Sequence, residues 1–342
     1  MAASKAASLP SEADHWSGRL PGRNISWSLA EEKLTRTPAG IEVGRDAPNS
    51  LYHSRFSQGA SLVPRMLICV EPVPSSPIGV AAGRKAIRSA RSANEKEPWK
   101  LLPAIEGAVE AEFVSPTHVG ATILPFRPLQ PWLAVIPRDQ KGLLSGDDPR
   151  LDLYPGLAEW WRKAETIWDA HKGDNNLSLL EQIDFRRKLS MQFPTAPHRI
   201  VYTKGGQYLA AARLEDQRIV IDHTLYWATA ASIDEARYLT AILNSPALTR
   251  LVTPLQAHGE HNPRHFDKYV WRLPIPLYDP ADDRHRALIE LAGRAEEVAT
   301  EVDVSNFRTF QAQRRRIREV LDATGIAGEI DALLLELVEP QS

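Results

Sequence analysis

The sequence predicts an α+β protein with a β-rich core, a helical insertion and a helical C-terminal part. Short apolar or alternating runs, punctuated by proline and glycine, dominate residues 51–232 and are typical of strands and turns. Longer segments with apolar residues at i, i+3, i+4 and i+7 dominate residues 233–342 and are typical of amphipathic helices. With 342 residues, 43% of them hydrophobic, the chain is long enough to bury a sizeable core.

The first half of the chain is expected to contain most of the strands. Residues 1–50 are rich in Ser, Ala, Gly and Pro, and we predict a poorly ordered segment there. The β-rich domain begins at residue 51, and a polar, basic insertion over 74–100, taken as a flexible loop, interrupts its strands. The strands are expected at 62–73, 108–114, 120–125 and 132–136.

A helical insertion is expected at 157–192. Trp160, Trp161 and Trp168 lie on one face of a helix over 157–171 and are expected in the core. A second helix is expected over 178–192. Three further strands then complete the β-rich domain, at 199–202, 208–213 and 218–223.

The C-terminal region, 233–342, is expected to be a helical support for the β-rich domain. Its first helix carries Asp234 and Glu235 in the first turn, where carboxylates interact favourably with the helix dipole. The expected helices span 233–243, 247–256, 283–298, 306–323 and 329–338.

Several classes of protein are disfavoured by simple features of the chain. No apolar run reaches the roughly 18 residues that span a bilayer, and residues 1–10 lack the apolar region of a signal peptide. The single cysteine, Cys69, excludes an intrachain disulfide. We therefore expect a cytoplasmic protein without a membrane partner.

The sequence lacks the common catalytic and cofactor-binding motifs. The sequence contains no Gly-x-Gly-x-x-Gly loop, no P-loop and no nucleophile elbow. We therefore predict no catalytic and no cofactor-binding residues. The spacing of His258, His261 and His265 would suit a metal on one helix face, but Gly259 and Pro263 interrupt that helix. No metal site is predicted.

The charge is unevenly distributed although the formal net charge is only −2. Basic residues cluster in two segments, 84–100 and 258–272, and screening limits the reach of charges to about 10 Å, so local clusters matter most. Such clusters suit a protein that contacts a polyanion on one side. The predicted DNA-binding residues are Arg84, Lys85, Arg88, Arg91, Asn94, Trp99 and Lys100 in the first segment and His258, His261, Arg264 and Lys268 in the second.

The chemistry of these side chains explains the prediction. Lysine and arginine neutralise phosphates, arginine also pairs with guanine, and asparagine pairs with adenine in the major groove. Solvated surface loops are the alternative for any one of these residues. Trp99 has two possible roles, stacking on a base or anchoring its loop to the core, and the anchor is favoured.

Several segments, taken in order, resemble a known family. They lie at 57–65, 98–100, 107–113, 123–127, 241–246 and 264–276, and include Leu-Asn-Ser-Pro at 243–246 and Leu-Pro-Ile-Pro at 273–276. This arrangement is similar to the C-terminal, TaqI-like target-recognition region of class I adenine-N6 DNA methyltransferases and type IIG-like restriction–modification proteins. The resemblance covers most of residues 51–338.

The resemblance implies sequence-specific binding of double-stranded DNA as the target-recognition part of such a system. In the family, this region follows a Rossmann-like catalytic domain that binds S-adenosylmethionine (SAM). Only about 50 residues precede it here, and the closest match to the Asn-Pro-Pro-Tyr loop, at 262–265, lacks the second proline and the aromatic residue. We therefore expect a truncated or split methyltransferase, with catalysis and SAM on a separate chain.

Two alternatives stay open at this point. In the first alternative, the chain is an active SAM-dependent methyltransferase or a nuclease subunit. In the second alternative, the chain is an interaction subunit that does not touch DNA. It docks a catalytic chain through the helix that carries Arg314 to Arg318. A solvent-exposed helix face is the simpler explanation for these arginines.

Overall fold

The structure, a computed structural model, describes residues 14–17, 22, 25–38, 49–73, 81–91, 95–256 and 265–338. The chain divides into two compact units, Met1–Pro48 and Asn49–Ser342. Within the first unit, strand β1 (Asp14–Ser17) pairs antiparallel with β2 (Thr35–Pro38). Helix α1 (Trp27–Lys33) lies between them in sequence and begins at the N-cap Ser26, whose hydroxyl accepts from Leu29 N. The poorly ordered segment expected over 1–50 falls largely outside the described residues.

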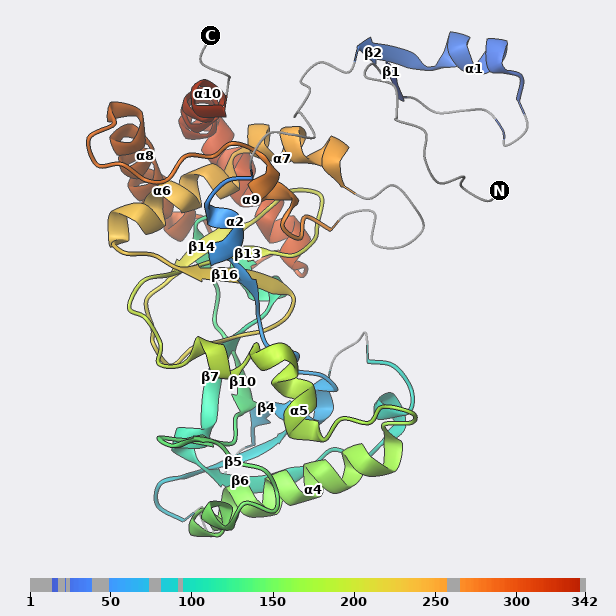
Figure 1. The fold of residues 1–342 in the computed structure, drawn as a ribbon, viewed down its shortest axis with the longest axis vertical. Helices are drawn as coiled ribbons and strands as arrows, with labels where there is room; N and C mark the ends of the chain where they lie inside the picture. Colours follow the sequence, from blue (N-terminus) through green and yellow to red (C-terminus); the bar gives the residue numbers. More distant parts are fainter. Residues whose placement is uncertain are drawn as a thin grey trace. The chain divides into compact units, whose positions relative to one another are not determined.

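The second unit contains a six-stranded mixed sheet, shown in the lower half of Figure 1, as far as the described residues extend. Its strands follow the order β15-β7-β10-β4-β5-β6, in which β15 pairs parallel with β7 and the other neighbours pair antiparallel. The strands are β4 (Cys69–Pro72), β5 (Arg84–Ser89), β6 (Glu106–Glu110), β7 (Val114–His118), β10 (Trp132–Val135) and β15 (Val220–Ile221).

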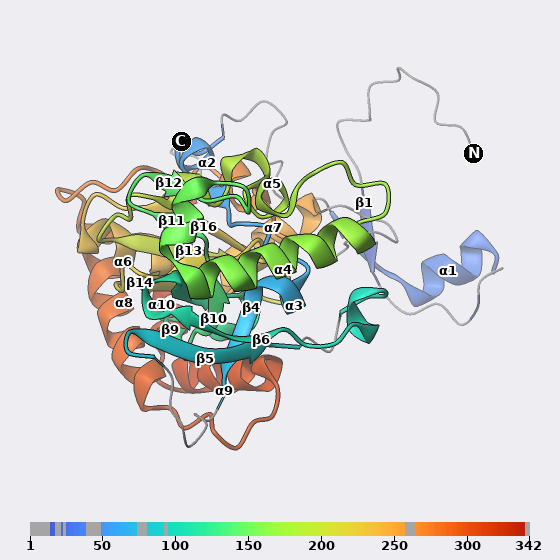
Figure 2. The same ribbon diagram turned by 90° about the horizontal axis from the view of Figure 1, so that it is seen from below.

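Helix α4 (Pro155–His171) covers this sheet on the β6 side, and Figure 2 shows it lying along the strands. Gly156 allows the close approach, because a Cβ there would lie 2.2 Å from Ala108 O. Trp160 and Trp161 are buried in the core between helix and sheet, together with Trp168. The expected position of all three in the core is confirmed.

A second sheet, shown above the first in Figure 1, has four antiparallel strands within the described part of the chain. Their order is β14 (Ala211–Leu214), β13 (Arg199–Thr203), β16 (Leu225–Thr229) and β3 (Ser57–Gln58). The C-terminal helices pack around it, with α6 against β13 and β14 and α8 against α6. These helices are α6 (Ile233–Asn244), α7 (Pro246–Val252), α8 (Asp283–Glu301), α9 (Phe310–Ala323) and α10 (Ile326–Val338).

Shorter elements connect the two sheets. The short α-helices are α2 (Tyr52–Arg55), α3 (Arg65–Ile68) and α5 (Leu179–Ile183). The two-residue strands pair as β8 (Ile123–Leu124) with β9 (Arg127–Pro128) and β11 (Arg138–Asp139) with β12 (Gly142–Leu143). Single 3-10 turns occur at Trp99–Leu101, Ala111–Phe113, Gly120–Thr122, Pro149–Leu153, Phe185–Arg187, Ser190–Gln192, Thr253–Leu255 and Tyr269–Arg272.

The predicted α+β class is confirmed, and several local predictions are wrong. The strand expected over 62–73 contains helix α3 (Arg65–Ile68), and only Cys69–Pro72 is extended, as β4. The basic insertion over 74–100 contains a regular strand, β5, because Ile87 and Ser89 alternate with charged residues and are buried in the sheet. The helix expected over 178–192 ends at Ile183, where α5 gives way to 3-10 turns. The division into domains at 51–232 and 233–342 stays a prediction.

Among the described helices, none is both long and apolar enough to cross a membrane.

A buried carboxylate ties the start of the second unit to its helical part. Glu235 of α6 is 5% exposed and accepts hydrogen bonds from Tyr52 Oη at 3.0 Å, Arg55 Nη1 at 2.7 Å and Ala231 N at 2.6 Å. Burial by itself would raise the pKa of Glu235, but the hydrogen bonds from Arg55 and Ala231 outweigh it and the pKa lies below its usual value. Glu235 therefore stabilises the fold as a carboxylate.

Replacing this carboxylate tests the connection. A group whose pKa is depressed by folding contributes stability above its unfolded pKa and loses it as the pH falls through the folded value. We expect Glu235→Gln to reduce the free energy of unfolding by about 2 kcal/mol near pH 7. The difference from wild type should shrink as the pH falls below about 4. Urea unfolding followed by tryptophan fluorescence at several pH values measures both effects. A pH-independent difference would contradict the assigned role.

Candidate nucleic-acid interface

A cleft of about 1160 Å³ lies where the two sheets of the second unit meet. The six-stranded half contributes the segment around Trp99 and the end of α4 from Trp168 to Gly173. The four-stranded half contributes Thr203–Gly205 and the start of α9. Small-molecule sites commonly enclose about 300–1,000 Å³, so this cleft is larger and suits contact with an extended ligand.

The cleft is strongly cationic. Of the described residues that line it, six are lysine or arginine and one is acidic, Glu95. Three histidines, His171, His223 and His265, also line the cleft. The six basic residues are Arg65, Arg91, Lys96, Lys172, Lys204 and Arg314. Clefts with one sign of charge focus the electrostatic field and attract ligands of the opposite sign.

Asp222 organises the side of the cleft formed by His223 and Thr224. Its carboxylate is 1% exposed and accepts from Thr224 N at 2.9 Å, Thr224 Oγ1 at 2.6 Å and His223 Nδ1 at 3.0 Å. Arg65 Nη2 lies 3.6 Å away and forms an ion pair with it. Burial by itself would raise the pKa of Asp222, but His223, Arg65 and Thr224 outweigh it and the pKa lies below its usual value. The carboxylate therefore stays ionised.

Arg65 reaches the cleft because the chain crosses from one sheet to the other just before it. Residues 57–69 run from β3 to β4, and on the way Gly59 packs against the backbone of Ile221 and Asp222. A Cβ on Gly59 would lie 2.4 Å from both carbonyl oxygens, so only glycine fits. The Arg65 guanidinium then stacks over Trp132, 4.8 Å from its ring centroid.

Arg314 approaches the same place from α9. It is 6% exposed, and its Nε donates to Ile123 O at 3.0 Å while Nη2 donates to Gly120 O. Gly120 N in turn donates to Thr224 Oγ1 at 2.7 Å, which links α9 to the Asp222 network. Burial lowers the pKa of Arg314 to about 9, so it keeps its charge at neutral pH.

Trp99 anchors one edge of the cleft, as favoured from the sequence. Its ring stacks on Trp168 with centroids 5.5 Å apart and meets His171 edge-on. Arg91 holds the same segment by donating to Trp99 O at 2.9 Å and to Leu102 O. Of the residues predicted to bind DNA, Arg91 and Trp99 thus line the cleft.

The other described candidates lie outside the cleft lining. On β5, Arg84 pairs with Glu110 at 3.0 Å and Arg88 pairs with Glu71 at 2.5 Å, so acids on neighbouring strands offset both charges. Lys268 donates to His53 O at 2.8 Å. Lys85 and Lys100 are exposed. Four candidates lie outside the described residues: Asn94, His258, His261 and Arg264.

Sequence reasoning missed most of the basic residues of the cleft, including Arg65, Lys172 and Lys204. They are isolated in the sequence and converge only in the fold, although Arg65 lies in the segment 57–65 that carries the family resemblance.

The helix that carries Arg314 to Arg318, considered above as a docking surface, is not a purely solvent-exposed face. Arg314 and Arg318 point into the protein, where Arg318 donates to Leu209 O, and Arg315 and Arg316 remain exposed.

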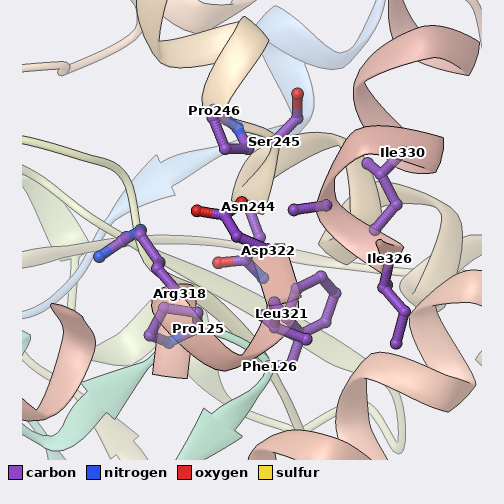
Figure 3. A pocket seen from close by; sticks show the side chains of 11 residues that line it. Pro125, Phe126, Asn244, Ser245, Pro246, Arg318, Leu321, Asp322, Ile326 and Ile330 are labelled. Carbon is purple, nitrogen blue, oxygen red and sulfur yellow. The ribbon is translucent and has the colours of Figure 1, made fainter. Parts of the chain in front are cut away.

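A much smaller cavity, of about 20 Å³, lies between the α6–α7 junction and helices α9 and α10 (Figure 3). It has room for about one water molecule. Asn244 beside it bonds Ala211 through both amide atoms, with N–O distances of 2.9 Å, and Ser245 caps α7 by accepting from Leu248 N. The Leu-Asn-Ser-Pro segment therefore has an architectural role.

Among the described residues, no cluster of His, Cys, Asp and Glu suits a metal ion.

Comparisons with known proteins identify no family and give two structural alignments with TM-scores below 0.5. No protein-family model matches the chain, and no curated protein matches it. The type IIL restriction-modification enzyme MmeI, determined in complex with DNA, aligns with a TM-score of 0.47 and 10% identity over 68% of this chain and 29% of that chain. The type IIG restriction endonuclease BpuSI aligns with a TM-score of 0.33 and 13% identity over 83% of this chain and 32% of that chain. This chain spans less than a third of either enzyme.

Neutralising Asp222 tests whether its carboxylate holds this side of the cleft together. We expect Asp222→Asn to lower the free energy of unfolding by about 3 kcal/mol near pH 7, because Arg65 loses its buried partner. Asp267→Asn is the matched control, since Asp267 is 38% exposed and 3.8 Å from Lys204 Nζ, and its loss should cost less than about 1 kcal/mol. Equal effects in urea unfolding would show that Asp222 has no special role.

Proposed function

We propose that this chain binds double-stranded DNA in the cationic cleft, as the target-recognition part of an adenine-specific restriction–modification system. The observation that carries the proposal is the excess of basic over acidic side chains in a cleft larger than a small-molecule site. Lysine and arginine that neutralise phosphates release counterions, and this release supplies much of the affinity of proteins for DNA. The sequence resemblance to target-recognition regions agrees with this proposal.

The aromatic residues of the cleft favour a duplex over a single strand. Proteins that bind single strands offer open aromatic faces on which successive bases stack. Here Trp99 and Trp168 already stack on each other, and Arg65 covers Trp132. The indole rings therefore serve to position the charged side chains, which suits contacts with the phosphates and groove edges of a duplex.

Lys96 and Lys204 are the best candidates for phosphate contacts. Lys96 is exposed and comes from the segment anchored by Trp99, whereas Lys204 comes from the turn between β13 and β14. The only ion pair of Lys204 with a described residue, to Asp267, is long at 3.8 Å. The two lysines belong to different halves of the cleft, so together they would contact the duplex at two places. The predicted residues Arg84, Lys85, Arg88, Lys100 and Lys268 are proposed as secondary contacts outside the cleft.

The chemical step is proposed to reside on a separate polypeptide. The sequence has neither the glycine-rich SAM loop nor the Asn-Pro-Pro-Tyr loop that would hold a flipped adenine. A partner that binds SAM would then methylate the site that this chain selects. The proposed place of action is the cytoplasm.

Removing the two lysines tests the binding site. We expect Lys96→Ala/Lys204→Ala to weaken duplex binding and to reduce the slope of log Kd against log salt by about 2, because two phosphate contacts are lost. Fluorescence anisotropy with a labelled duplex at several salt concentrations measures both quantities. Lys141→Ala/Lys163→Ala is the matched control, since both of these lysines are exposed and neither lines the cleft. If the control changed the slope as much as the test variant, the cleft would not be the binding site.

Incubation with labelled SAM tests where catalysis resides. We expect the purified chain to bind duplex DNA without transferring a methyl group, because the motifs for SAM and for the flipped base are missing. Radiolabel recovered in the DNA would contradict the proposed division of labour. A methyltransferase with known activity on the same duplex serves as the positive control.

A further inference from the structure

Residues 184–192, here called the arginine turn, have an unusual backbone next to the cleft. Arg186 and Arg187 both have positive φ, 57° and 60°. Side chains with a Cβ rarely adopt this left-handed region, and glycine or asparagine normally occupies it. Two consecutive arginines in this conformation therefore store backbone strain, which is most often found where function requires a fixed geometry.

The turn keeps this conformation because hydrogen bonds hold it at several points. The Asp184 carboxylate accepts from Leu189 N at 2.9 Å and from Ser190 N at 2.8 Å, which closes the turn on itself. Buried Gln192 bonds both backbone groups of Ile221, with its Nε2 donating at 2.9 Å and its Oε1 accepting at 2.8 Å. The turn is therefore a rigid structure tied to strand β15.

Further hydrogen bonds place the turn beside the cleft. Lys188 Nζ donates to Gln58 Oε1 at 2.6 Å, and Gln58 Nε2 donates at 2.7 Å to the carbonyl oxygen of His223, a cleft residue. Gln182, two residues before the turn, lines the cleft itself. Burial, together with the positive charges of Arg186 and Lys204, lowers the pKa of Lys188. The exposed Arg186 and Arg187 add positive charge at this edge of the cleft.

The side chains at the tip of the turn are directed to solvent. Phe185 is 41% exposed, and Arg186 and Arg187 are both exposed. Arg186 packs over the Phe185 ring at 5.3 Å, and neither arginine forms an ion pair with any described residue. Two guanidinium groups without an acidic partner among the described residues, carried on a turn whose backbone is held by hydrogen bonds, are suited to a planar, bidentate acceptor.

We propose that Arg186 and Arg187 read guanine in the major groove of the duplex held by the cleft. This inference rests on the proposed function and names its specificity-determining residues. Guanine offers O6 and N7 as a pair of acceptors that matches the two donors of a guanidinium group. The hydrogen-bonded turn fixes the backbone from which both arginines project, whereas the lysines of the cleft contribute affinity without regard to sequence.

Selection from a pool of duplexes with a randomised core tests the proposal. The preferred duplex and versions with each guanine replaced by adenine are then compared in binding assays. We expect Arg186→Ala/Arg187→Ala to reduce the discrimination between them by roughly tenfold or more. Arg186→Lys/Arg187→Lys keeps both charges, so it should bind unrelated duplexes as wild type does and still lose discrimination, because an ammonium group does not offer two coplanar donors.

The matched control is Arg315→Ala/Arg316→Ala, which removes the same charge from an exposed part of α9 outside the cleft lining. It should retain the discrimination of wild type. Retained discrimination in the lysine variant would overturn base reading and leave only phosphate contacts, as would a wild type that binds all duplexes equally. A wild type that binds no duplex would instead overturn the proposed function, and this inference with it. Thermal melts of all variants check folding, and the lysine variant keeps the side chains long enough to preserve local packing.

Discussion

The ionised carboxylate of Asp222 is the constraint on which the cleft depends. A buried charge costs several kcal/mol unless it is paired and hydrogen bonded. Asp222 satisfies this requirement with Thr224, His223 and Arg65, and these same three residues line the cleft. The segment that carries it also bonds the crossing chain, since Ala60 N donates to Ile221 O at 2.8 Å. One electrostatic requirement thus fixes both the junction of the sheets and the surface offered to a ligand.

Three arginines that are buried or partly buried, Arg199, Arg314 and Arg318, donate to backbone carbonyl oxygens and not to acidic side chains. Arg199 donates to Ile219 O and Asp216 O, Arg314 donates to Ile123 O and Gly120 O, and Arg318 donates to Leu209 O. Carbonyl oxygens accept from these guanidinium groups without cancelling their charge, and of their buried nitrogen atoms only Arg199 Nε lacks a partner among the described residues. Arg314 therefore packs α9 against β8 and still adds its full charge to the cleft. The same contact serves stability and electrostatics.

The sequence predicted the long elements well and the short ones poorly, for physical reasons. The helix with Trp160, Trp161 and Trp168 on one face has a clear period, and α4 occupies Pro155–His171. Strand β5 was missed because its arginines and lysine suggested a loop, whereas cross-strand acids allow them on a sheet. The two-residue strand β3 has no periodicity at all. The arginine turn was assigned to a helix because a positive φ at arginine leaves no trace in a hydrophobic pattern.

The cleft could not be predicted from the sequence for a further reason. The net charge of a chain says little about the electrostatic potential at one place on its surface. The formal net charge of −2 argues mildly against a nucleic-acid binder. In the fold, however, many acids pair with cations away from the cleft, as Glu296 does with Arg213 and Arg237 and as Asp139 does with Arg150. None of these residues lines the cleft, and an acid paired with a cation contributes little net charge to its surroundings. The cleft can therefore attract an anion although the whole chain is slightly acidic.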